Sequence, residues 1–448
     1  MKIAIVGAGY VGLVTAACFA EFGFEVVCID KEPEKIRRLR QGEIPIHEPG
    51  LDVLVASSQR AGRLTFSDDL TASVKSAQVV FIAVGTPTRR GDDAADLAFV
   101  KEAARQIALA MNGFTVVVTK STVPVGTARM LKALIRETRP DADFEMAANP
   151  EFLREGSAVE DFLKPDRVVV GIEAERARER MERLYRPLMQ RDVPVLFTGF
   201  ETAEIIKYAA NAFLATRIGF INEIADICEE VGADVVAVTR GMGLDHRIGQ
   251  HYLQPGPGFG GSCFPKDTRA LVSIARQAGA PNRIVEAVVS SNEARKDRLV
   301  NRVSKALGGS LKGLRIGILG VAFKADTDDM REAAALSLIP GLQAQGATVQ
   351  AFDPVAMKAA APLLPSVAWC SDAYEAAREA DALVVLTEWN EFRGLDLKRL
   401  AGSMRNPVLF DFRNIYSPGD MQSASFTYHS IGRPVVGGAL RALGARVG

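Results

Sequence analysis

Residues 2–12 read Lys-Ile-Ala-Ile-Val-Gly-Ala-Gly-Tyr-Val-Gly, a short apolar run that leads directly into three closely spaced glycines. A continuous apolar run of this length is typical of a strand buried on both faces in a parallel sheet. An apolar helix follows to about residue 22, and a second strand occupies residues 25–29. This stretch therefore predicts the strand–helix–strand unit that opens a doubly wound α/β domain.

The three glycines, Gly7, Gly9 and Gly12, form a Gly-x-Gly-x-x-Gly pattern between the first strand and the first helix. In that setting they allow a tight turn, a close approach of a pyrophosphate and close packing of helix on strand. Asp30 ends the second strand, 18 residues after Gly12, where a carboxylate can accept hydrogen bonds from ribose hydroxyls. Because an acid there repels a 2′-phosphate, we predict NAD rather than NADP, a preference that neighbouring Lys31 weakens.

The alternation of strands and helices continues through the first 200 residues. Further strands are expected at 79–84, 115–119, 145–148, 167–171 and 193–198. Polar residues follow the carboxyl ends of three of them, which is where open α/β sheets bind ligands. Thr86, Thr122 and Glu155 are therefore candidates for cofactor binding or catalysis, with an ordinary turn or helix-cap role as the alternative.

A long helix is expected from residue 202 to residue 231, with no proline and one interior glycine. Lys207 and Asn211 are four residues apart and so share one face of this mostly apolar helix. They are candidate catalytic residues, and a solvated helix face is the alternative. A long apolar helix is also a natural seam for a homodimer, because one chain can hardly cover all its sides.

The segment 257–269 reads Pro-Gly-Phe-Gly-Gly-Ser-Cys-Phe-Pro-Lys-Asp-Thr-Arg and places three glycines around one thiol, Cys263. Glycines let backbone N–H groups approach a substrate or a developing oxyanion. Lys266 and the start of a helix expected at residues 268–278 would both favour the Cys263 thiolate, and Asp267 lies at the turn into that helix. This combination predicts covalent catalysis, with a small buried cysteine in a tight turn as the alternative.

A helix expected at 282–307 closes the central region, and Gly-Gly-Ser at 308–310 is a short linker. A second alternation follows the linker, with a helix expected at 333–345. Its strands are expected at 315–319, 348–352, 382–387 and 408–412. Lys324 and Arg413 follow strand ends, where they either hold phosphates or are surface charges. The predicted fold is thus two Rossmann-like, doubly wound parallel-sheet domains at 1–199 and 310–448, joined by a helical region at 200–309.

Composition excludes several classes of function. The 54 basic and 54 acidic residues cancel, which gives no reason to expect nucleic acid or a membrane surface as partner. The five cysteines are widely spaced and odd in number, which predicts reduced thiols in the cytoplasm, and the four histidines show no pattern that predicts a metal. No apolar run is long enough to span a membrane.

With these residues laid out, the chain resembles the nucleotide-sugar dehydrogenases, the UDP-glucose/GDP-mannose dehydrogenase family, from residue 1 to about 420. The motifs that carry this resemblance are GAGYVG (7–12), PIHEPGL (45–51), GTPT (85–88), KSTVPVGT (120–127), NPEFLREG (149–156), the Lys207/Asn211 pair, GFGGSCFPKD (258–267), GVAFKADTDD (320–329) and FDFRN (410–414). The Pro-Gly-Pro-Gly before Phe259 and the segment 247–252 favour UDP-glucose over GDP-mannose or an N-acetylated sugar nucleotide. The charged loop 89–94 departs from the family pattern.

The resemblance implies an NAD-dependent oxidation of a sugar CH2OH to a carboxylate in two steps, through a thiohemiacetal and a thioester on Cys263. The implied catalytic residues are Thr122, Glu151, Glu155, Lys207, Asn211, Cys263 and Asp267. The first base is Lys207 or a water held by Asn211 and Asp267, and the hydrolytic base is Glu155 or Asp267.

The same resemblance implies two sets of binding residues. Those for NAD are Gly7, Gly9, Tyr10, Val11, Gly12, Asp30, Lys35, Thr86, Thr122, Glu155, Lys266 and Arg331. Those for the sugar nucleotide are Glu151, Phe152, Leu153, Lys207, Asn211, Arg247, Tyr252, Gly260, Lys324 and Arg413, with Arg247 reaching the substrate of a neighbouring subunit.

Two other functions account for part of the sequence pattern. A hydroxyacid dehydrogenase of the 6-phosphogluconate type shares the first domain, the long helix and the Lys/Asn pair, but needs neither Cys263 nor residues 310–420. A catalytically inactive sensor of NAD or of a sugar nucleotide has no need of a nucleophile.

Overall fold

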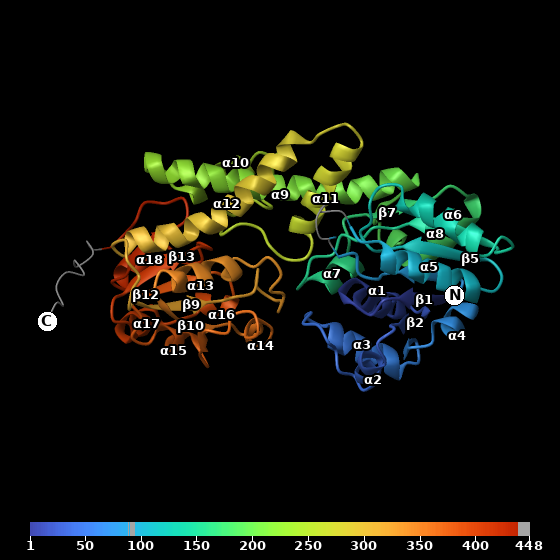
Figure 1. The fold of residues 1–448 in the computed structure, drawn as a ribbon, viewed down its shortest axis with the longest axis horizontal. Coiled ribbons are helices and arrows are strands. Elements are labelled where there is room, and N and C mark those ends of the chain that lie inside the picture. The colour runs from blue at the N-terminus through green and yellow to red at the C-terminus, as the bar shows by residue number, and fades with distance from the viewer. Residues whose placement is uncertain (88, 90–94, 438–448) are drawn as a thin grey trace. The chain divides into compact units, whose positions relative to one another are not determined.

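The computed structural model describes residues 1–87, 89 and 95–437. The chain divides into two compact units (Figure 1). The first unit holds residues 1–210 and 270–281, and the second holds residues 211–269 and the chain from residue 282 onward. The predicted positions Thr88 and 90–94, with the tail from residue 438, lie outside the described residues.

The first unit is built on one sheet of eight strands, in the order β3-β2-β1-β4-β5-β6-β7-β8. Its elements are β1 (Lys2–Val6), α1 (Tyr10–Glu21), β2 (Glu25–Ile29), α2 (Pro33–Arg40), α3 (Leu51–Arg60), β3 (Leu64–Ser67), α4 (Leu70–Lys75), β4 (Val79–Ile82), α5 (Ala98–Ala110), β5 (Thr115–Thr119), α6 (Thr127–Thr138), β6 (Phe144–Ala148), α7 (Ala158–Leu163), β7 (Val168–Gly171), α8 (Glu175–Met189) and β8 (Val195–Thr198). All neighbouring strands pair in parallel except β6 and β7, which meet antiparallel at Ala148 and Gly171.

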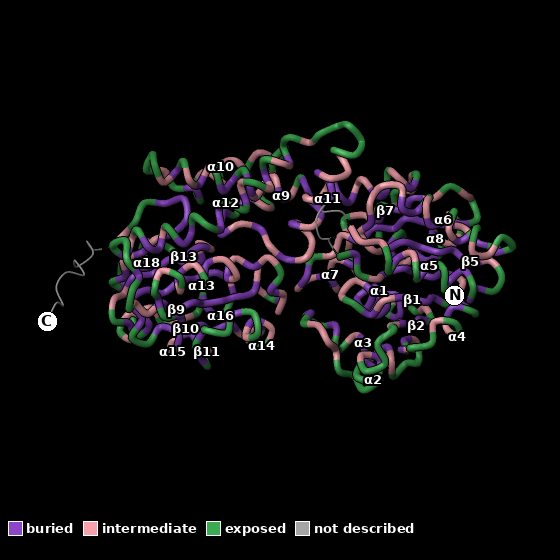
Figure 2. Tube along the Cα trace, viewed as in Figure 1, coloured by how far each residue is buried: buried purple, intermediate pink, exposed green. Residues whose placement is uncertain are grey.

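Both faces of this sheet are covered, because its central strands β4 and β5 are buried at every position. Along β1, Ile3 and Ile5 pack on one side with residues of α1, α3, α7 and α8. Ala4 and Val6 pack on the other side with residues of α4, α5 and α6. Alternate side chains of a strand point to opposite faces, so a continuous apolar run fits a strand between two helical layers. Figure 2 shows the strands mostly as buried chain.

The second unit contains a sheet of six parallel strands, in the order β11-β10-β9-β12-β13-β14. Its elements are α10 (Val235–Gly243), α12 (Arg283–Ala306), β9 (Arg315–Leu319), α13 (Ala335–Ala344), β10 (Thr348–Phe352), α14 (Met357–Ala360), β11 (Val367–Trp369), α15 (Ala373–Ala377), β12 (Ala382–Val385), α16 (Asn390–Arg393), α17 (Leu397–Ser403), β13 (Val408–Asp411), α18 (Pro418–Ser423) and β14 (Thr427–Ser430). Along β12, Ala382 and Val384 face one apolar cluster, and Leu383 and Val385 face another.

Two helices, α9 (Phe200–Val231) and α11 (Phe264–Gln277), belong partly to each unit. α9 matches the long helix expected from the sequence. α11 begins four residues earlier than expected, directly after Cys263. The reason is that Pro265 fits the first turn of a helix, where a backbone N–H has no partner within the helix.

The predicted fold class of two doubly wound sheets with a central helical region is confirmed. Within the described chain, no helix combines the length and the apolar character that a membrane crossing requires.

Candidate active site

The turn between β1 and α1 gives each of the three predicted glycines a separate spatial role. A Cβ atom on Gly7, whose φ is +109°, would lie 2.5 Å from the carbonyl oxygen of Ala83. A Cβ atom on Gly12 would lie 1.8 Å from the carbonyl oxygen of Gly7, so the helix packs directly on the turn. A Cβ atom on Gly9 would meet nothing within 4 Å. The turn therefore leaves room at Gly9, beside the N-terminus of α1, and fits a pyrophosphate.

Asp30 ties the end of β2 to this turn. Its carboxylate accepts hydrogen bonds from the backbone N–H of Ala8 at 2.9 Å and of Glu32 at 3.1 Å. The ammonium of Lys35 on α2 lies 3.1 Å from Asp30 Oδ2, and the Asp30 side chain stays 10% exposed. The structure thus brings Asp30 and Lys35 together and leaves an edge of the carboxylate open to ribose hydroxyls.

Glu48, in the motif at 45–51, is a buried carboxylate that the sequence reasoning did not select. It accepts hydrogen bonds from the backbone N–H groups of Gly156 and Ala158, each at 2.7 Å, and from the Tyr10 hydroxyl. Burial and the Glu48 carboxylate raise the pKa of Tyr10 above its ordinary value. Glu48 thereby anchors the loop that carries Glu155, which is itself buried.

The carboxyl ends of β5 and β6 border a narrow pocket in the first unit. Its lining residues are Thr119, Ser121, Thr122, Val123, Ala148, Pro150, Glu204 and Lys207. The hydroxyl of Thr86 donates to the carbonyl oxygen of Thr122 at 2.9 Å, which joins the loops after β4 and β5. The structure therefore places Thr86, Thr122 and Lys207 at the sheet edge where the sequence predicts ligand binding.

Lys207 forms a buried ion pair with Glu151. The Lys207 Nζ lies 2.9 Å from Glu151 Oε1, and the two side chains are 3% and 4% exposed. Glu151 Oε2 also accepts from the backbone N–H of Leu153 at 2.6 Å. Burial alone would raise the pKa of Glu151, but the charge and hydrogen bond of Lys207, with the Leu153 N–H, hold it below its ordinary value. The Lys207 ammonium lies 5.5 Å from the centre of the Phe152 ring.

A second buried group, in the second unit, joins three predicted residues. Asn211 Nδ2 donates to Asp267 Oδ2 at 2.7 Å, and Lys266 Nζ lies 2.7 Å from Asp267 Oδ1. The Asp267 residue is fully buried. Each carboxylate oxygen therefore has its own partner, and the pair fixes the orientation of the Asn211 amide. The Lys266 ammonium contacts Asp267 in the first turn of α11. This turn directly follows the cysteine loop, residues 256–263.

Cys263 lies immediately before the first residue of α11 and is partly exposed, whereas the other four cysteines are buried. Its carbonyl oxygen accepts the first helical hydrogen bond, from the backbone N–H of Asp267 at 2.8 Å. The hydroxyl of Ser262 lies 3.4 Å from the Cys263 sulfur. A thiol at the N-terminus of a helix has its thiolate form favoured by the helix dipole.

Buried polar side chains from α9 and α12 hold the cysteine loop in place. Asn222 Oδ1 accepts from the backbone N–H of Gly256 at 2.8 Å, and Arg295 Nε donates to the Gly256 carbonyl at 2.7 Å. Asn292 Oδ1 accepts from the backbone N–H of Phe259 at 2.8 Å. The sequence reasoning missed these three side chains, although they are polar residues at buried helix positions, like the Lys207/Asn211 pair.

Arg413, directly after the loop residue Phe412, is held firmly at a strand end. Its Nε donates to the carbonyl oxygen of Leu386 at 2.7 Å and lies 3.0 Å from Glu388 Oε2. Another guanidinium nitrogen donates to the carbonyl oxygen of Phe323, the residue before Lys324. The structure therefore brings the segments that contain Arg413 and Lys324 together, and both segments follow strand ends.

Four further predicted substrate and cofactor residues lie in the second unit. A Cβ atom on Gly260 would lie 2.5 Å from the carbonyl oxygen of Glu332, so this glycine permits close packing of the cysteine loop. Tyr252 has a φ of +60°, and its ring lies 6.0 Å from that of Phe264. Arg247 is 79% exposed and paired with Asp245. Arg331, 63% exposed, is paired with Asp329.

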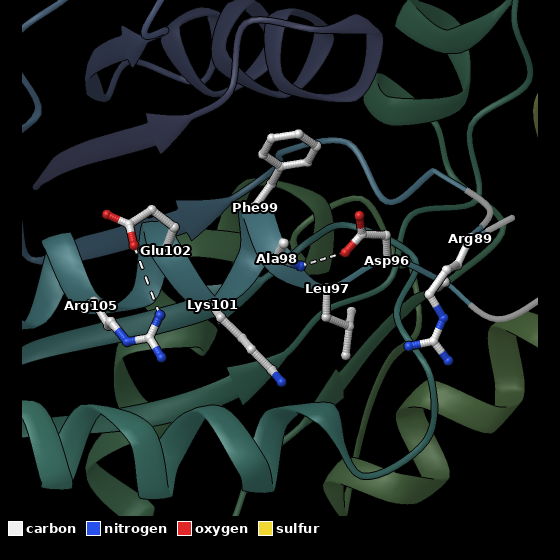
Figure 3. Close-up of a pocket in the computed structure, with 9 residues that line it drawn as sticks. Arg89, Asp96, Leu97, Ala98, Phe99, Lys101, Glu102 and Arg105 are labelled. Carbon is white, nitrogen blue, oxygen red and sulfur yellow. Dashed lines mark hydrogen bonds and ion pairs between the residues drawn. The ribbon is translucent and has the colours of Figure 1, made fainter.

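A separate hollow of about 650 Å³ lies at the start of α5 in the first unit (Figure 3). Arg89, Lys101 and Arg105 contribute positive charge to it, and Arg105 lies 3.9 Å from Glu102. It contains none of the predicted catalytic or binding residues, so it is distinct from the pocket that contains Lys207.

Comparison with known proteins agrees with this geometry. The sequence matches the UDP-glucose/GDP-mannose dehydrogenase family over its NAD-binding domain at residues 1–189, its central domain at 201–294 and its UDP-binding domain at 317–418. The chain belongs to the UDP-glucose/GDP-mannose dehydrogenase family. Membership confirms the resemblance drawn from the motifs, and the chain is an enzyme, an NAD-dependent oxidoreductase.

Similar family members include two bacterial proteins. The UDP-glucose 6-dehydrogenase of Rhizobium meliloti is 55% identical over 97% of this chain and all of its own length. The UDP-glucose 6-dehydrogenase TuaD of Bacillus subtilis is 47% identical over 98% of this chain and 94% of its own. Among solved structures, a UDP-glucose dehydrogenase from Pyrobaculum islandicum superposes with a TM-score of 0.89 at 37% identity, covering 96% of this chain and 98% of its own.

Proposed function

We propose that this enzyme oxidises the primary alcohol of UDP-glucose to a carboxylate, giving UDP-glucuronate. The observation that most supports the proposal is the partly exposed Cys263 at the N-terminus of α11. Asp267, four residues later, is buried and accepts a hydrogen bond from Asn211. A simple alcohol dehydrogenase needs no such thiol. The names of the relatives that are 55% and 47% identical support UDP-glucose as the substrate.

The oxidation removes four electrons in two steps. NAD, which the glycine turn and Asp30 would hold, would supply the hydride acceptor for each step. In the first step, Lys207, or a water held by Asn211 and Asp267, takes the hydroxyl proton while the adjacent carbon loses a hydride. The product of this step is an aldehyde at the sugar carbon.

The second step runs through Cys263. Its thiolate adds to the aldehyde carbon, and the carbonyl oxygen takes up a proton to give a thiohemiacetal. The hydroxyl of the thiohemiacetal then loses its proton while the carbon that bears it loses a hydride, which leaves a thioester. A water activated by Glu155 or Asp267 then cleaves the carbon–sulfur bond, which releases the carboxylate and the thiol. Lys207 and Asn211 stabilise the oxyanion of the tetrahedral states.

The sugar nucleotide is assigned to residues that match the family motifs. Glu151, the Phe152–Leu153 backbone, Tyr252, Gly260, Lys324 and Arg413 bind it, and Thr122 with Glu151 orders water near the reacting carbon. The same assignment gives Thr86, Thr122, Glu155, Lys266 and Arg331 to the cofactor. The division into 1–199, 200–309 and 310–448 follows these roles, and five free thiols fit a cytoplasmic location.

An exposed apolar stripe on α9 supports a homodimer. Phe213, Phe220 and Ile227 are 63%, 50% and 55% exposed and recur every seven residues, so they share one helix face. Large apolar side chains aligned in this way mark a protein contact surface. Exposed Arg247 is then available to the substrate of a neighbouring subunit.

The test is to count NADH formed for each UDP-glucose consumed, with UDP-glucose limiting and NAD in excess. Two NADH for each sugar support the four-electron oxidation. One NADH for each sugar would indicate a two-electron oxidation, and Cys263 would then have only a structural role. Turnover only with GDP-mannose or an N-acetylated UDP-sugar would keep the mechanism and replace the substrate.

The Cys263→Ser variant tests the covalent route. We expect sustained uronate production to fall about 1,000-fold or more, because a serine hydroxyl at neutral pH is a far weaker nucleophile than a thiolate. Cys228→Ser is the matched control, since Cys228 is buried away from the cysteine loop and its replacement should leave turnover intact. Normal uronate production by Cys263→Ser would reject the covalent route.

A further inference from the structure

Glu332, in the loop between β9 and α13, has a backbone conformation that is rare for its residue type. Its φ is +54°, in the left-handed region that a Cβ atom disfavours. A residue held in this region costs free energy and persists only where the surrounding contacts fix it, and such residues cluster at functional sites. The contacts of Glu332 therefore indicate what this conformation serves.

The backbone at Arg331 and Glu332 lies against the cysteine loop. The backbone N–H of Gly261 donates to the carbonyl oxygen of Arg331 at 2.8 Å. A Cβ atom on Gly260 would lie 2.5 Å from the carbonyl oxygen of Glu332, so a side chain there would displace the Glu332 backbone. Cys263 follows Gly261 by two residues, so a displacement of this backbone would also displace the thiol.

The Glu332 side chain joins two helices to this backbone. Its Oε1 lies 3.1 Å from a guanidinium nitrogen of Arg269 on α11, and its Oε2 lies 3.1 Å from the ammonium of Lys296 on α12. The Arg269, Lys296 and Glu332 side chains are 25%, 10% and 37% exposed, so both cations are largely shielded from water. Salt screens such pairs less than pairs on an open surface. The two cations therefore hold the Glu332 carboxylate in place.

The same face of α12 also contacts the cysteine loop directly. Asn292 precedes Lys296 by four residues, so the two side chains share one face of the helix. Asn292 Oδ1 accepts from the backbone N–H of Phe259 at 2.8 Å, and its Nδ2 donates to the Phe259 carbonyl at 3.1 Å. The cysteine loop is thus attached to α12 at Phe259 and to the Glu332 segment at Gly261, and the Lys296–Glu332 ion pair connects the two attachments.

We propose that Glu332 is a positioning residue for Cys263. Its carboxylate, held by the two cations, fixes the backbone that accepts the Gly261 N–H, and so keeps the thiolate in place for attack on the aldehyde carbon. This inference rests on the proposed function and adds a residue to its second step. The first hydride transfer does not use Cys263, so it continues without the Glu332 carboxylate. Thiolate addition slows, and the aldehyde then leaves before it is trapped.

The test is the number of NADH formed for each UDP-glucose consumed by Glu332→Gln, with hydroxylamine present to trap released aldehyde as an oxime. The substitution keeps the size of the side chain and replaces one carboxylate oxygen with an NH2 group, which cannot accept a hydrogen bond from a cation. The ratio should fall from two in the wild-type enzyme toward one in the variant. A variant that was only less stable would be slower at an unchanged ratio, and an unchanged ratio would overturn the proposal.

Glu293→Gln is the matched control, because Glu293 on α12 pairs with the same Arg269 guanidinium at 3.0 Å from a side chain that is 55% exposed. It should keep the ratio of two. A fall as large as that of Glu332→Gln would assign the effect to Arg269 and overturn the proposal. Lys296→Met removes the other partner of Glu332 and should lower the ratio in the same direction, and it replaces Glu332→Gln in every measurement should that variant fail to fold.

Hydrogen–deuterium exchange without substrate separates this proposal from the proposed function. In Glu332→Gln the Gly261 N–H should exchange about tenfold faster than in the wild-type protein, because its acceptor is no longer fixed. The measurement is mass spectrometry of a peptide that covers residues 257–263. An unchanged exchange rate would overturn the proposal. Faster exchange in the variant, together with one NADH for each sugar in the wild-type enzyme, would count against the proposed function alone.

Discussion

The two sheets share one strand order through six strands, yet their first turns differ. In the first unit, α1 begins four residues after β1 ends, and Gly9 leaves space beside its N-terminus. In the second unit, α13 begins 16 residues after β9 ends. Gly320, directly after β9, is packed as closely as Gly7 is after β1, since a Cβ atom there would lie 2.3 Å from the Thr387 side chain, so the turns differ in length and not in their first glycine.

The acids that follow the second strand of each sheet show the same contrast. Asp30 after β2 accepts two backbone N–H groups and pairs with Lys35, and it keeps an exposed edge. Asp353 after β10 is fully buried, and five donors occupy it: the backbone N–H groups of residues 321, 322, 355 and 356 and the indole of Trp389. The same position is thus left partly open in one sheet and is fully occupied by protein donors in the other.

The comparison shows that strand order alone does not specify a dinucleotide site. The site depends on the length of the turn and on whether protein groups already satisfy the acid. The second sheet keeps the topology, while its first turn is longer and is used for packing.

Replacing the two acids should separate their roles most strongly. Asp353→Ala leaves buried donors without an acceptor, so we expect the second unit to lose about 3–5 kcal/mol of unfolding free energy. Asp30→Ala should cost the fold less than about 1 kcal/mol and weaken NADH binding about tenfold. Urea unfolding followed by far-UV circular dichroism reports on both units, whereas tryptophan fluorescence follows the second unit, where Trp369 and Trp389 both lie. Equal destabilisation by both variants would remove the contrast.

The glycine turn of the first unit should be the next most sensitive place. Gly12→Ala puts a methyl group onto the Gly7 carbonyl, so the turn must move, and we expect NADH affinity to fall about 100-fold. Gly9→Ala is the matched control, because its methyl group meets no protein atom. It should leave thermal stability unchanged and lower NADH affinity only through the space that its methyl group takes from the pyrophosphate. Wild-type NADH binding by Gly12→Ala, measured by NADH fluorescence, would contradict this account.

A smaller effect is expected from His429 on β14, whose ring stacks on Phe410 at 4.7 Å. Burial, with the charge of Arg302 adding, lowers the pKa of His429 from 6.5 to about 4. The unfolded chain therefore binds a proton that the folded chain does not, and stability present above pH 6.5 is lost as pH falls toward 4.

His429→Phe keeps the stacked ring and removes the titration. Between pH 7 and pH 4.5 the wild-type protein should lose about 2 kcal/mol more unfolding free energy than the variant. The measurement is urea unfolding at both pH values, followed by tryptophan fluorescence. An identical pH dependence for the two proteins would show that His429 does not titrate in this window.

Local patterns sufficed to predict the strands and the glycine turn, because apolar runs and glycine spacing act over a few residues. The sequence pattern predicts a start of α11 four residues too late, because the run of apolar residues in this helix begins only after Thr268. Glu48 could not be predicted, because its partner Ala158 lies 110 residues away. The same holds for Asn292, which meets the cysteine loop 33 residues before it in the chain.

The chain passes between the two compact units three times, at 210/211, 269/270 and 281/282. No single truncation can therefore yield either unit intact: a fragment ending at residue 210 lacks the piece 270–281, and a fragment starting at 211 carries that piece without its unit. A gene split at either place would give two unstable products.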